Sequence, residues 1–432
     1  ITIGDWSSDV CSSDLFFSEE IRKKMNILVV NAGSSSLKYQ LIDTDTDTLY
    51  AKGICERIGA PGSQIEHKQI VKGLKVTVQA PMKDHAEAMK LVVKYLTDAE
   101  YGCISSMNEI QAIGHRIVHG GAFFSQSILM TEDVLAKLEQ CRDFAPLHTE
   151  AHLMGIKGCL ETMPDKPQVL VFDTAFHQTM KPEAYMYALP YAYYEKYGIR
   201  RYGAHGTSHR YVSAEMAKLL GKPIEQTKIV TCHIGNGSSI SAVMGGKVVD
   251  TSMGFTPLAG VEMGTRCGDI DSAIVPYVME KEGLSTQEIN DVMNKRSGFS
   301  GISGFSSDSR DLEAAIAKGP ADEHYERANL AVNILKHQIK KYIGGYVALM
   351  NGLDAVVFTA GIGENNPHLR EIVCEDMEFF GIRFNAEANR AALHLSNPVK
   401  LSADDSRVAV YVIPTNEELV IAKDTAAIVS GK

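Results

Sequence analysis

Three turns rich in glycine and serine directly follow apolar runs, and turns of this kind are suited to binding phosphate. They span residues 31–34, 233–239 and 359–365. Glycine lets backbone N–H groups converge on phosphate oxygens, because it has no side chain and tolerates positive φ. None of the turns contains the Gly-Lys-Ser/Thr of a P-loop or fits the dinucleotide-binding fingerprint. Three such turns in one chain therefore predict a phosphate site that is not a P-loop.

Two arginines lie in glycine-rich segments where they could bind an anion. Arg116 lies in segment 114–121 and Arg266 in segment 262–269. A guanidinium group can bind carboxylate or phosphate through two parallel hydrogen bonds, so both residues are candidates for substrate binding. The alternative for each arginine is an ordinary surface ion pair.

Two acidic residues follow apolar runs at positions where active sites of α/β proteins form. Asp173 comes directly after the run 169–172, and Glu417 comes shortly after the run 408–413. A single glutamate can suffice for Mg²⁺, which takes few protein oxygens and retains several waters. The alternative for Glu417 is a favourable interaction with the dipole of the helix it begins.

Histidine is concentrated in the middle of the chain, with eight of the 14 histidines between residues 115 and 233. His148 and His152, like His205 and His209, have the spacing of a helical metal pair, although neither pair fits His-Glu-x-x-His. An imidazole can also donate a hydrogen bond to a phosphoryl group during its transfer. A metal site and a phosphoryl-binding site are both compatible with this pattern.

The elements that position these residues form a repeating pattern. Apolar runs 27–30 and 37–42 lie on either side of the first turn, which predicts a strand, a tight turn and a strand. Runs 228–232 and 240–243 repeat this unit around the second turn, and glycines 245–246 then indicate a hairpin. A unit that recurs at domain-sized spacing indicates duplicated domains.

Helices are predicted between the strands. The apolar positions of the clearest one recur at steps of three and four, at Tyr325, Ala328, Val332, Leu335, Ile339, Tyr342, Tyr346 and Met350. Gly352 is its stop signal. Thr415 is predicted to cap a final helix, with Glu418 at the capping-box position. Strands that alternate with helices indicate an α/β fold.

Composition excludes several classes of protein. The chain has 432 residues, 45% of them hydrophobic, which suggests two or three domains. No apolar run is long enough for a membrane span. The net charge of −10 argues against a nucleic-acid-binding protein. Eight cysteines without a Cys-x-x-Cys pair favour free thiols in a reducing cytoplasm.

Residues 1–24 differ in character from the rest, because Ser-Ser-Asp recurs within a segment of low complexity. The segment lacks the basic start and apolar middle of a signal peptide. Two interpretations apply: a tail of foreign origin before a natural start at Met25, or a flexible native extension.

Two motifs resemble signatures of the acetate kinase family. The first is Asn-Ala-Gly-Ser-Ser-Ser-Leu-Lys at 31–38, and the second is Arg-Tyr-Gly-Ala-His-Gly-Thr-Ser-His at 201–209. The resemblance continues in order from Met25 to the end of the chain, through residues 233–239, 264–269, 361–365 and 415–418.

This resemblance implies an α/β fold with two duplicated actin-like, ribonuclease H-like domains and a nucleotide cleft between them. The first domain is expected to comprise 25–175 plus 414–432, and the second 176–413. The family resemblance also implies a homodimer.

The resemblance further implies a role for each matching residue. The catalytic group comprises Arg116, Asp173, His205 and Arg266, and Asn31 and Glu417 are the expected ligands of Mg²⁺ or Mn²⁺. Arg116 also contacts the substrate carboxylate, and the pocket for the substrate methyl group comprises Val118, Leu147, Ala204 and Pro257. Ala204 replaces a phenylalanine of some family members, which leaves the tightness of this pocket undetermined. The expected nucleotide contacts are Lys38, His233, Ile234, Gly235, Asn236, Gly237, Asp308, Ser309, Arg310, Gly361, Ile362, Gly363, Glu364 and Asn365.

The implied reaction is reversible, magnesium-dependent transfer of a phosphoryl group from ATP to acetate by direct in-line attack. Acetate is already ionised, so no general base is required, and catalysis depends on positioning and charge neutralisation. The alternatives are a propionate or butyrate kinase with the same chemistry, an actin-like ATPase, and a carbohydrate kinase in which Asp173 is the base.

Overall fold

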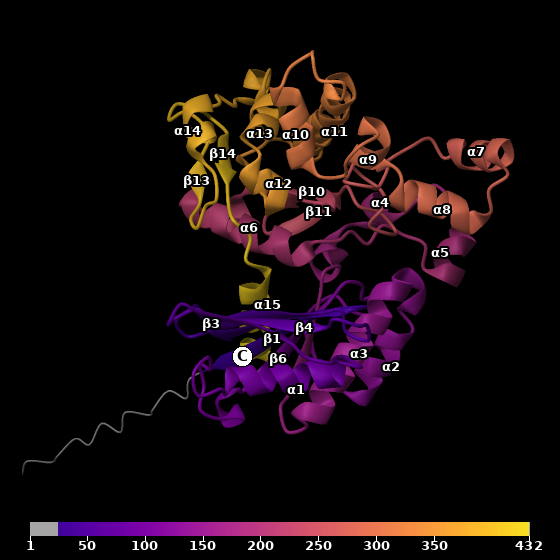
Figure 1. Ribbon diagram of the computed structural model, residues 1–432. Coiled ribbons are helices and arrows are strands. Elements are labelled where there is room, and N and C mark those ends of the chain that lie inside the picture. Colours follow the sequence, from indigo (N-terminus) through magenta and orange to yellow (C-terminus); the bar gives the residue numbers. More distant parts are fainter. Residues whose placement is uncertain (1–24, 432) are drawn as a thin grey trace, which may run out of the picture.

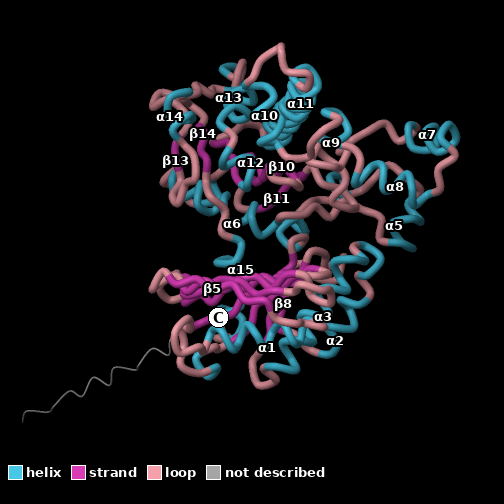
Figure 2. The backbone as a smooth tube through the Cα atoms, in the orientation of Figure 1, coloured by secondary structure: helices cyan, strands magenta, loops and turns pink. Residues whose placement is uncertain are grey.

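The computed structural model describes residues 25–431, apart from the side chains of 146 and 147, and has two β-sheets covered by helices (Figure 1). The predicted tail, 1–24, lies outside the described residues. Within the described part, the strands form an eight-stranded sheet, β5-β4-β3-β2-β1-β6-β8-β7, and a six-stranded sheet, β11-β10-β9-β12-β14-β13. Figure 2 shows the two sheets as separate groups of strands.

The first sheet and the helices that alternate with its strands come from the first part of the chain. Their bounds are β1 Asn26–Gly33, β2 Ser36–Asp43, β3 Thr48–Glu56, β4 Gln64–Gln69, β5 Leu74–Gln79, α1 His85–Leu96, β6 Ala112–Ile117, β7 Ile128–Leu129, α2 Glu132–Glu139, α3 Pro146–Thr162 and β8 Gln168–Phe172.

The second sheet and its helices follow in the sequence, and the last helix, α15, returns to pack on the first sheet. Their bounds are α4 Pro182–Tyr185, α5 Tyr191–Tyr197, α6 Gly206–Leu219, β9 Lys228–Ile234, β10 Ser238–Met244, β11 Lys247–Thr251, α7 Ile274–Glu282, α8 Thr286–Lys295, α9 Gly298–Ser303, α10 Ser309–Ala317, α11 Tyr325–Met350, β12 Ala355–Thr359, α12 Ala360–Asn365, α13 Pro367–Cys374, α14 Ala386–Ala391, β13 Val399–Lys400, β14 Ala409–Val412 and α15 Glu417–Val429.

The centres of the two sheets have the same topology. In the first, β3, β2 and β1 are successively antiparallel, and β1, β6 and β8 are parallel. In the second, β11, β10 and β9 repeat the antiparallel part, and β9, β12 and β14 repeat the parallel part. The predicted duplicated actin-like fold is confirmed. The predicted domain boundaries, with a first domain of 25–175 plus 414–432, stay a prediction.

The first strand of each sheet is buried on both faces, as its uninterrupted apolar run indicates. In β1, Leu28 packs in a cluster with Met89 of α1, whereas Val29 packs in a second cluster with Ile421 of α15. Strand β9 alternates in the same way between α11 and α6. Each fully buried apolar side chain contributes about 1.5–3 kcal/mol, so the central strands are fixed in register.

Helix α15 returns the end of the chain to its beginning, and in Figure 1 it lies in yellow beside the indigo strands. The prediction that Thr415 caps this helix, with Glu418 completing a capping box, is wrong by one residue. The cap is Asn416, whose side chain accepts a hydrogen bond from the Leu419 N–H at 3.1 Å. Thr415 instead donates its hydroxyl to Ser208 at 2.9 Å.

The predicted helix over residues 325–350 is confirmed as α11. It ends at Asn351, which adopts a left-handed conformation with φ 51°. Over the described residues, no helix combines the length and the hydrophobicity that crossing a membrane requires.

Candidate active site

Arg116 and Asp173 meet because their strands are parallel neighbours. Arg116 is near the end of β6, and Asp173 directly follows β8. The Asp173 carboxylate accepts from Arg116 Nη2 at 2.8 Å and from Nε at 3.1 Å. Asp173 is 1% exposed, and its negative charge raises the pKa of Arg116. The pair therefore holds a permanently charged guanidinium in a fixed orientation.

The same carboxylate is also connected to helix α6. Thr207 donates its hydroxyl to Asp173 Oδ1 at 3.3 Å, and the Gly206 N–H donates to the Asp173 carbonyl at 2.8 Å. An acid whose two oxygens both accept hydrogen bonds from the protein is arranged to orient its partners. This geometry favours a positioning role for Asp173 over the role of a general base.

Glu417 approaches the same arginine from the start of α15. Its Oε2 lies 3.9 Å from Arg116 Nη2, and its Oε1 is buried without a hydrogen-bond partner in the described structure. Burial raises the pKa of Glu417 to about 7, although the charge of Arg116 opposes the shift. A buried carboxylate oxygen that accepts no hydrogen bond is suited to binding a cation.

The histidine pairs do not form a metal site in the described structure, where no cluster of three or more potential ligands occurs. Instead, His205 and His209 both contact the Ser239 hydroxyl, at 2.9 and 2.7 Å. In the other pair, His152 Nε2 accepts from the Val118 N–H at 3.1 Å.

Arg266 and His205 converge on the second glycine-rich turn. A Cβ atom added to Gly237 would lie 3.3 Å from Arg266 Nη1 and 3.6 Å from His205 Nε2. Arg266 has no acidic partner among the described ion pairs, and its Nη1 donates to the Pro257 carbonyl at 3.4 Å. An unneutralised guanidinium beside a glycine turn is suited to an anionic group with several oxygens.

His205 itself lies at the start of α6 in a left-handed conformation, with φ 59°. Its ring stacks on that of His233, with centroids 4.0 Å apart. Burial, reinforced by His233 and His209, lowers the pKa of His205 well below its usual range, and burial lowers the pKa of His233 to about 3. Both imidazoles are therefore neutral at physiological pH.

A cavity of about 460 Å³ begins at the same turn, at Gly235 and Asn236. Its volume is within the range of small-molecule sites. It brings together several predicted nucleotide contacts from separate segments, namely Gly235, Asn236, Asp308, Ser309, Arg310, Gly361, Ile362 and Asn365. Glu313 also lines it but was missed in the sequence, where it reads as an ordinary helical residue.

The remaining predicted nucleotide contacts lie outside the lining of this cavity. His233, Ile234 and Gly237 flank it in sequence, and Gly363 belongs to α12. Glu364 accepts hydrogen bonds from the backbone of Ala360 and Thr415, at 2.9 and 3.1 Å, so its carboxylate joins α12 to the segment before α15.

Lys38 and Asn31 face each other across the β1–β2 pair. With Glu418 they line a separate groove. Asn31 follows Val30, which pairs with His115 of β6, so Asn31 lies on the strand next to the one that carries Arg116.

Three of the four residues of the predicted methyl pocket adjoin residues of the candidate site in sequence or by a hydrogen bond. Val118 is two residues after Arg116, Ala204 precedes His205 and is 4% exposed, and the Pro257 carbonyl binds Arg266. Leu147 belongs to α3, but its side chain lies outside the described part of the structure.

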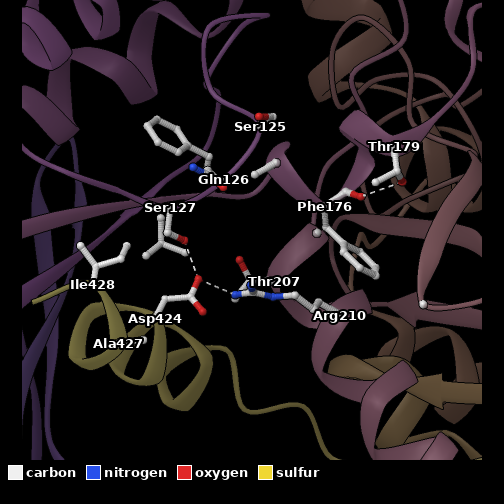
Figure 3. Close-up of a pocket in the computed structure, with 15 residues that line it drawn as sticks. Ser125, Gln126, Ser127, Phe176, Thr179, Thr207, Arg210, Asp424, Ala427 and Ile428 are labelled. Carbon is white, nitrogen blue, oxygen red and sulfur yellow. Dashed lines mark hydrogen bonds and ion pairs between the residues drawn. The ribbon is translucent and has the colours of Figure 1, made fainter. Parts of the chain in front are cut away.

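A second cavity, of about 320 Å³, lies between α6 and α15 (Figure 3). Arg210 of α6 points toward Asp424 of α15, with Nη2 and Oδ2 2.7 Å apart, and Ser127 donates to the same oxygen. Thr207 lines this cavity and also donates its hydroxyl to Asp173. Sequence patterns gave no signal for it, because its walls come from five distant segments.

A duplicated two-sheet fold, with a cavity of small-molecule size that begins at the glycine-rich turn beside Arg266, gives the chain the arrangement expected of a phosphotransferase of the actin-like fold. It belongs to the acetokinase family, because the model of that family matches residues 26–423. An acetate kinase of Halothermothrix orenii is 53% identical over 407 residues, which cover 94% of this chain and 100% of that protein.

Solved structures agree with this assignment. The crystal structure of Porphyromonas gingivalis acetate kinase has a TM-score of 0.89 and 46% identity, with 94% of this chain and all of that chain covered. A propionate kinase from Francisella tularensis has a TM-score of 0.84 and 39% identity, with 93% and 99% of the two chains covered.

Proposed function

We propose that this chain catalyses the reversible transfer of a phosphoryl group between ATP and acetate, which gives acetyl phosphate and ADP. The observation that carries the proposal is the placement of two half-buried guanidinium groups, one oriented by Asp173 and the other beside Gly237. The reaction needs one cation for the acetate carboxylate and another for the phosphoryl group. The similar proteins named acetate kinase support this choice of acceptor.

The transfer is a direct in-line displacement. One acetate oxygen attacks the γ-phosphorus, the bond from phosphorus to the bridging oxygen breaks, and its electron pair leaves with ADP. Because acetate attacks as an anion, no proton has to be removed. Arg116 binds the carboxylate, while Arg266 and the neutral imidazole of His205 donate to the phosphoryl oxygens, where charge is redistributed in the transition state.

A divalent cation, Mg²⁺ or Mn²⁺, fits the residues at the start of α15. The buried, unpartnered Oε1 of Glu417 is an oxygen ligand that lacks a protein donor, and Asn31 offers a neutral oxygen on β1. The cation would neutralise charge on the nucleotide phosphates. Two protein ligands are enough for Mg²⁺, which usually retains waters and binds phosphate oxygens.

The rival functions make different demands on the site. A propionate or butyrate kinase would use the same groups with a wider methyl pocket. The acetate kinases of Halothermothrix orenii and Porphyromonas gingivalis, at 53% and 46% identity, are more similar to this chain than the propionate kinase is, at 39%. An actin-like ATPase has no use for the Arg116–Asp173 pair as a carboxylate clamp. A carbohydrate kinase needs a free base, whereas Asp173 is hydrogen-bonded on both oxygens.

We also propose that two copies associate through the face on which α5, α7 and α8 project from the molecule in Figure 1. This face exposes large apolar side chains in the single chain, namely Tyr191, Tyr193, Tyr197, Ile274 and Tyr277. Sedimentation equilibrium should give twice the chain mass.

The free thiols of the described cysteines suit a cytoplasmic enzyme.

Trapping the acyl phosphate with hydroxylamine tests the function. Acetate, propionate and butyrate are compared by kcat/KM at fixed ATP and Mg²⁺. We expect acetate to be the best substrate and propionate to be weaker, because one methylene changes the transition-state energy by only about 1–3 kcal/mol. ATP hydrolysis without acyl-phosphate formation would refute the proposed function.

A further inference from the structure

A chain of hydrogen bonds leads from His205 into the core of the second sheet. His205 Nδ1 lies 2.9 Å from the Ser239 hydroxyl, which lies 2.7 Å from His209 Nε2. His209 Nδ1 then lies 2.7 Å from the Thr231 hydroxyl. Ser239, His209 and Thr231 are fully buried, at 0% exposure, so no water replaces a missing partner at low cost.

The opposite nitrogen of His205 faces the phosphate turn. Nε2 lies on the side of Gly237, where Arg266 also points. Phosphoryl oxygens only accept hydrogen bonds, so Nε2 must carry a proton to interact with them favourably. A neutral imidazole has one N–H, and therefore His205 Nδ1 must be an acceptor when Nε2 is the donor.

The number of protons on each group then determines the donor and the acceptor of every hydrogen bond in the series. Ser239 has one hydroxyl proton, and it must donate this proton to His205 Nδ1. Its oxygen is left to accept from His209 Nε2–H, so His209 Nδ1 must accept from the hydroxyl of Thr231. Thr231 can supply that proton, since its other acceptor, the Ser241 carbonyl, lies at a longer distance of 3.4 Å.

All the hydrogen bonds of this series can also have the opposite donor and acceptor. In that arrangement Thr231 donates to the Ser241 carbonyl, and each later donor and acceptor exchange roles until His205 Nε2 has no proton. That state would present a lone pair to the phosphoryl group. The 2.7 Å contact between Thr231 and His209 is made in both directions, so it does not select one of them. The partner of His205 Nε2 does, because phosphoryl oxygens only accept hydrogen bonds and therefore favour the direction that makes His205 a donor.

We propose that Ser239, His209 and Thr231 are positioning residues that hold His205 as its Nε2–H tautomer, so that a neutral imidazole donates to the transferring phosphoryl group. This inference rests on the proposed function for the role of His205, but the tautomer itself is independent of turnover. The neighbours of His205 that carry or can acquire positive charge are His233, His209, Arg116 and Arg266, and they disfavour a second proton on its ring.

Thr231→Val tests the inference away from the cleft, since valine has the shape of threonine but no hydroxyl. Thr231→Ser is the matched control, because it keeps the donor. We expect Thr231→Val to lower kcat about tenfold, as loss of one buried hydrogen bond predicts, with unchanged KM for ATP and acetate. Thr231→Ser should retain kcat within a factor of two to three.

The tautomer is measured directly by ¹⁵N NMR of labelled histidine, in the free protein and with ADP, aluminium fluoride and acetate. The His205 signals are assigned by their loss in His205→Gln. We expect the Nε2–H form in the wild type and in Thr231→Ser, and a mixture of both tautomers in Thr231→Val. Circular dichroism and the Kd for ADP establish that each variant is folded.

Two results would overturn the inference: an Nδ1–H tautomer in the wild-type complex, or a Thr231→Val protein with wild-type kcat and an unchanged His205 spectrum. Failure of the proposed function gives a different result. A wild type that forms no acyl phosphate would refute the function, while its NMR spectrum would still report the tautomer.

Discussion

Arg266 is the most informative single residue of the site, because it is a half-buried cation without an acidic partner in the described structure. Arg266→Ala removes a donor that acts on the phosphoryl group, so kcat should fall by about 10²–10³. The measurement is steady-state acyl-phosphate formation. Arg142→Ala is the control, because Arg142 pairs with Glu150 outside the site. A loss below tenfold for Arg266→Ala would contradict its role.

Glu262 should make the stability of the folded protein depend on pH. It is 2% exposed, and neither carboxylate oxygen has a hydrogen-bond partner in the described structure. Burial raises its pKa to about 8. The folded protein therefore binds a proton that the unfolded chain has released, and stability is lost as the pH rises from the ordinary glutamate range toward 8.

Glu262→Gln removes this charge. We expect the variant to be more stable than the wild type at pH 9 by about 1–3 kcal/mol, with a smaller difference at pH 5. Urea unfolding across this pH range provides the measurement. Glu195→Gln, at an exposed position, should show no such trend. A constant difference at all pH values would contradict the assignment.

At the scale of an element, the start of α15 depends on Asn416. Its side chain accepts from the Leu419 N–H, and the helix places Glu417 beside Arg116. Asn416→Ala should lower the free energy of unfolding by about 1 kcal/mol, whereas Asn416→Asp keeps a capping oxygen and should lower it less. Denaturant titration compares the two variants, and equal losses would show that the cap is not responsible.

At the scale of the whole molecule, the Arg210–Asp424 pair joins a helix on each sheet across the second cavity (Figure 3). Asp424→Asn weakens this link. The pair is partly exposed, so the loss of stability should stay below about 1 kcal/mol. We expect the nucleotide-free variant to have a larger radius of gyration by small-angle X-ray scattering, and ADP with acetate to restore the wild-type value. Identical scattering without ligand would contradict this prediction.

Much of the site could be predicted because its residues lie next to apolar strands or in glycine-rich turns, which are recognisable in the sequence. Asp173 follows a five-residue buried strand, Gly237 lies in a glycine-rich turn, and both sheets begin with uninterrupted apolar runs. The similarity between the two strand–turn–strand units also predicted the duplication, because each unit closes locally and needs no distant partner.

The sequence by itself therefore determined several central strands, the long helix, the glycine-rich turns and the family. Only the tertiary structure decided which partners the polar groups have. In the folded protein, Arg116 donates to Asp173, and Asn416 rather than Thr415 caps α15. A hydrogen-bonded series also connects His205 through Ser239 to His209. The physical reason is that these contacts join segments far apart in the chain, and their geometry depends on how the sheets pack, whereas strand and helix patterns depend on neighbouring residues.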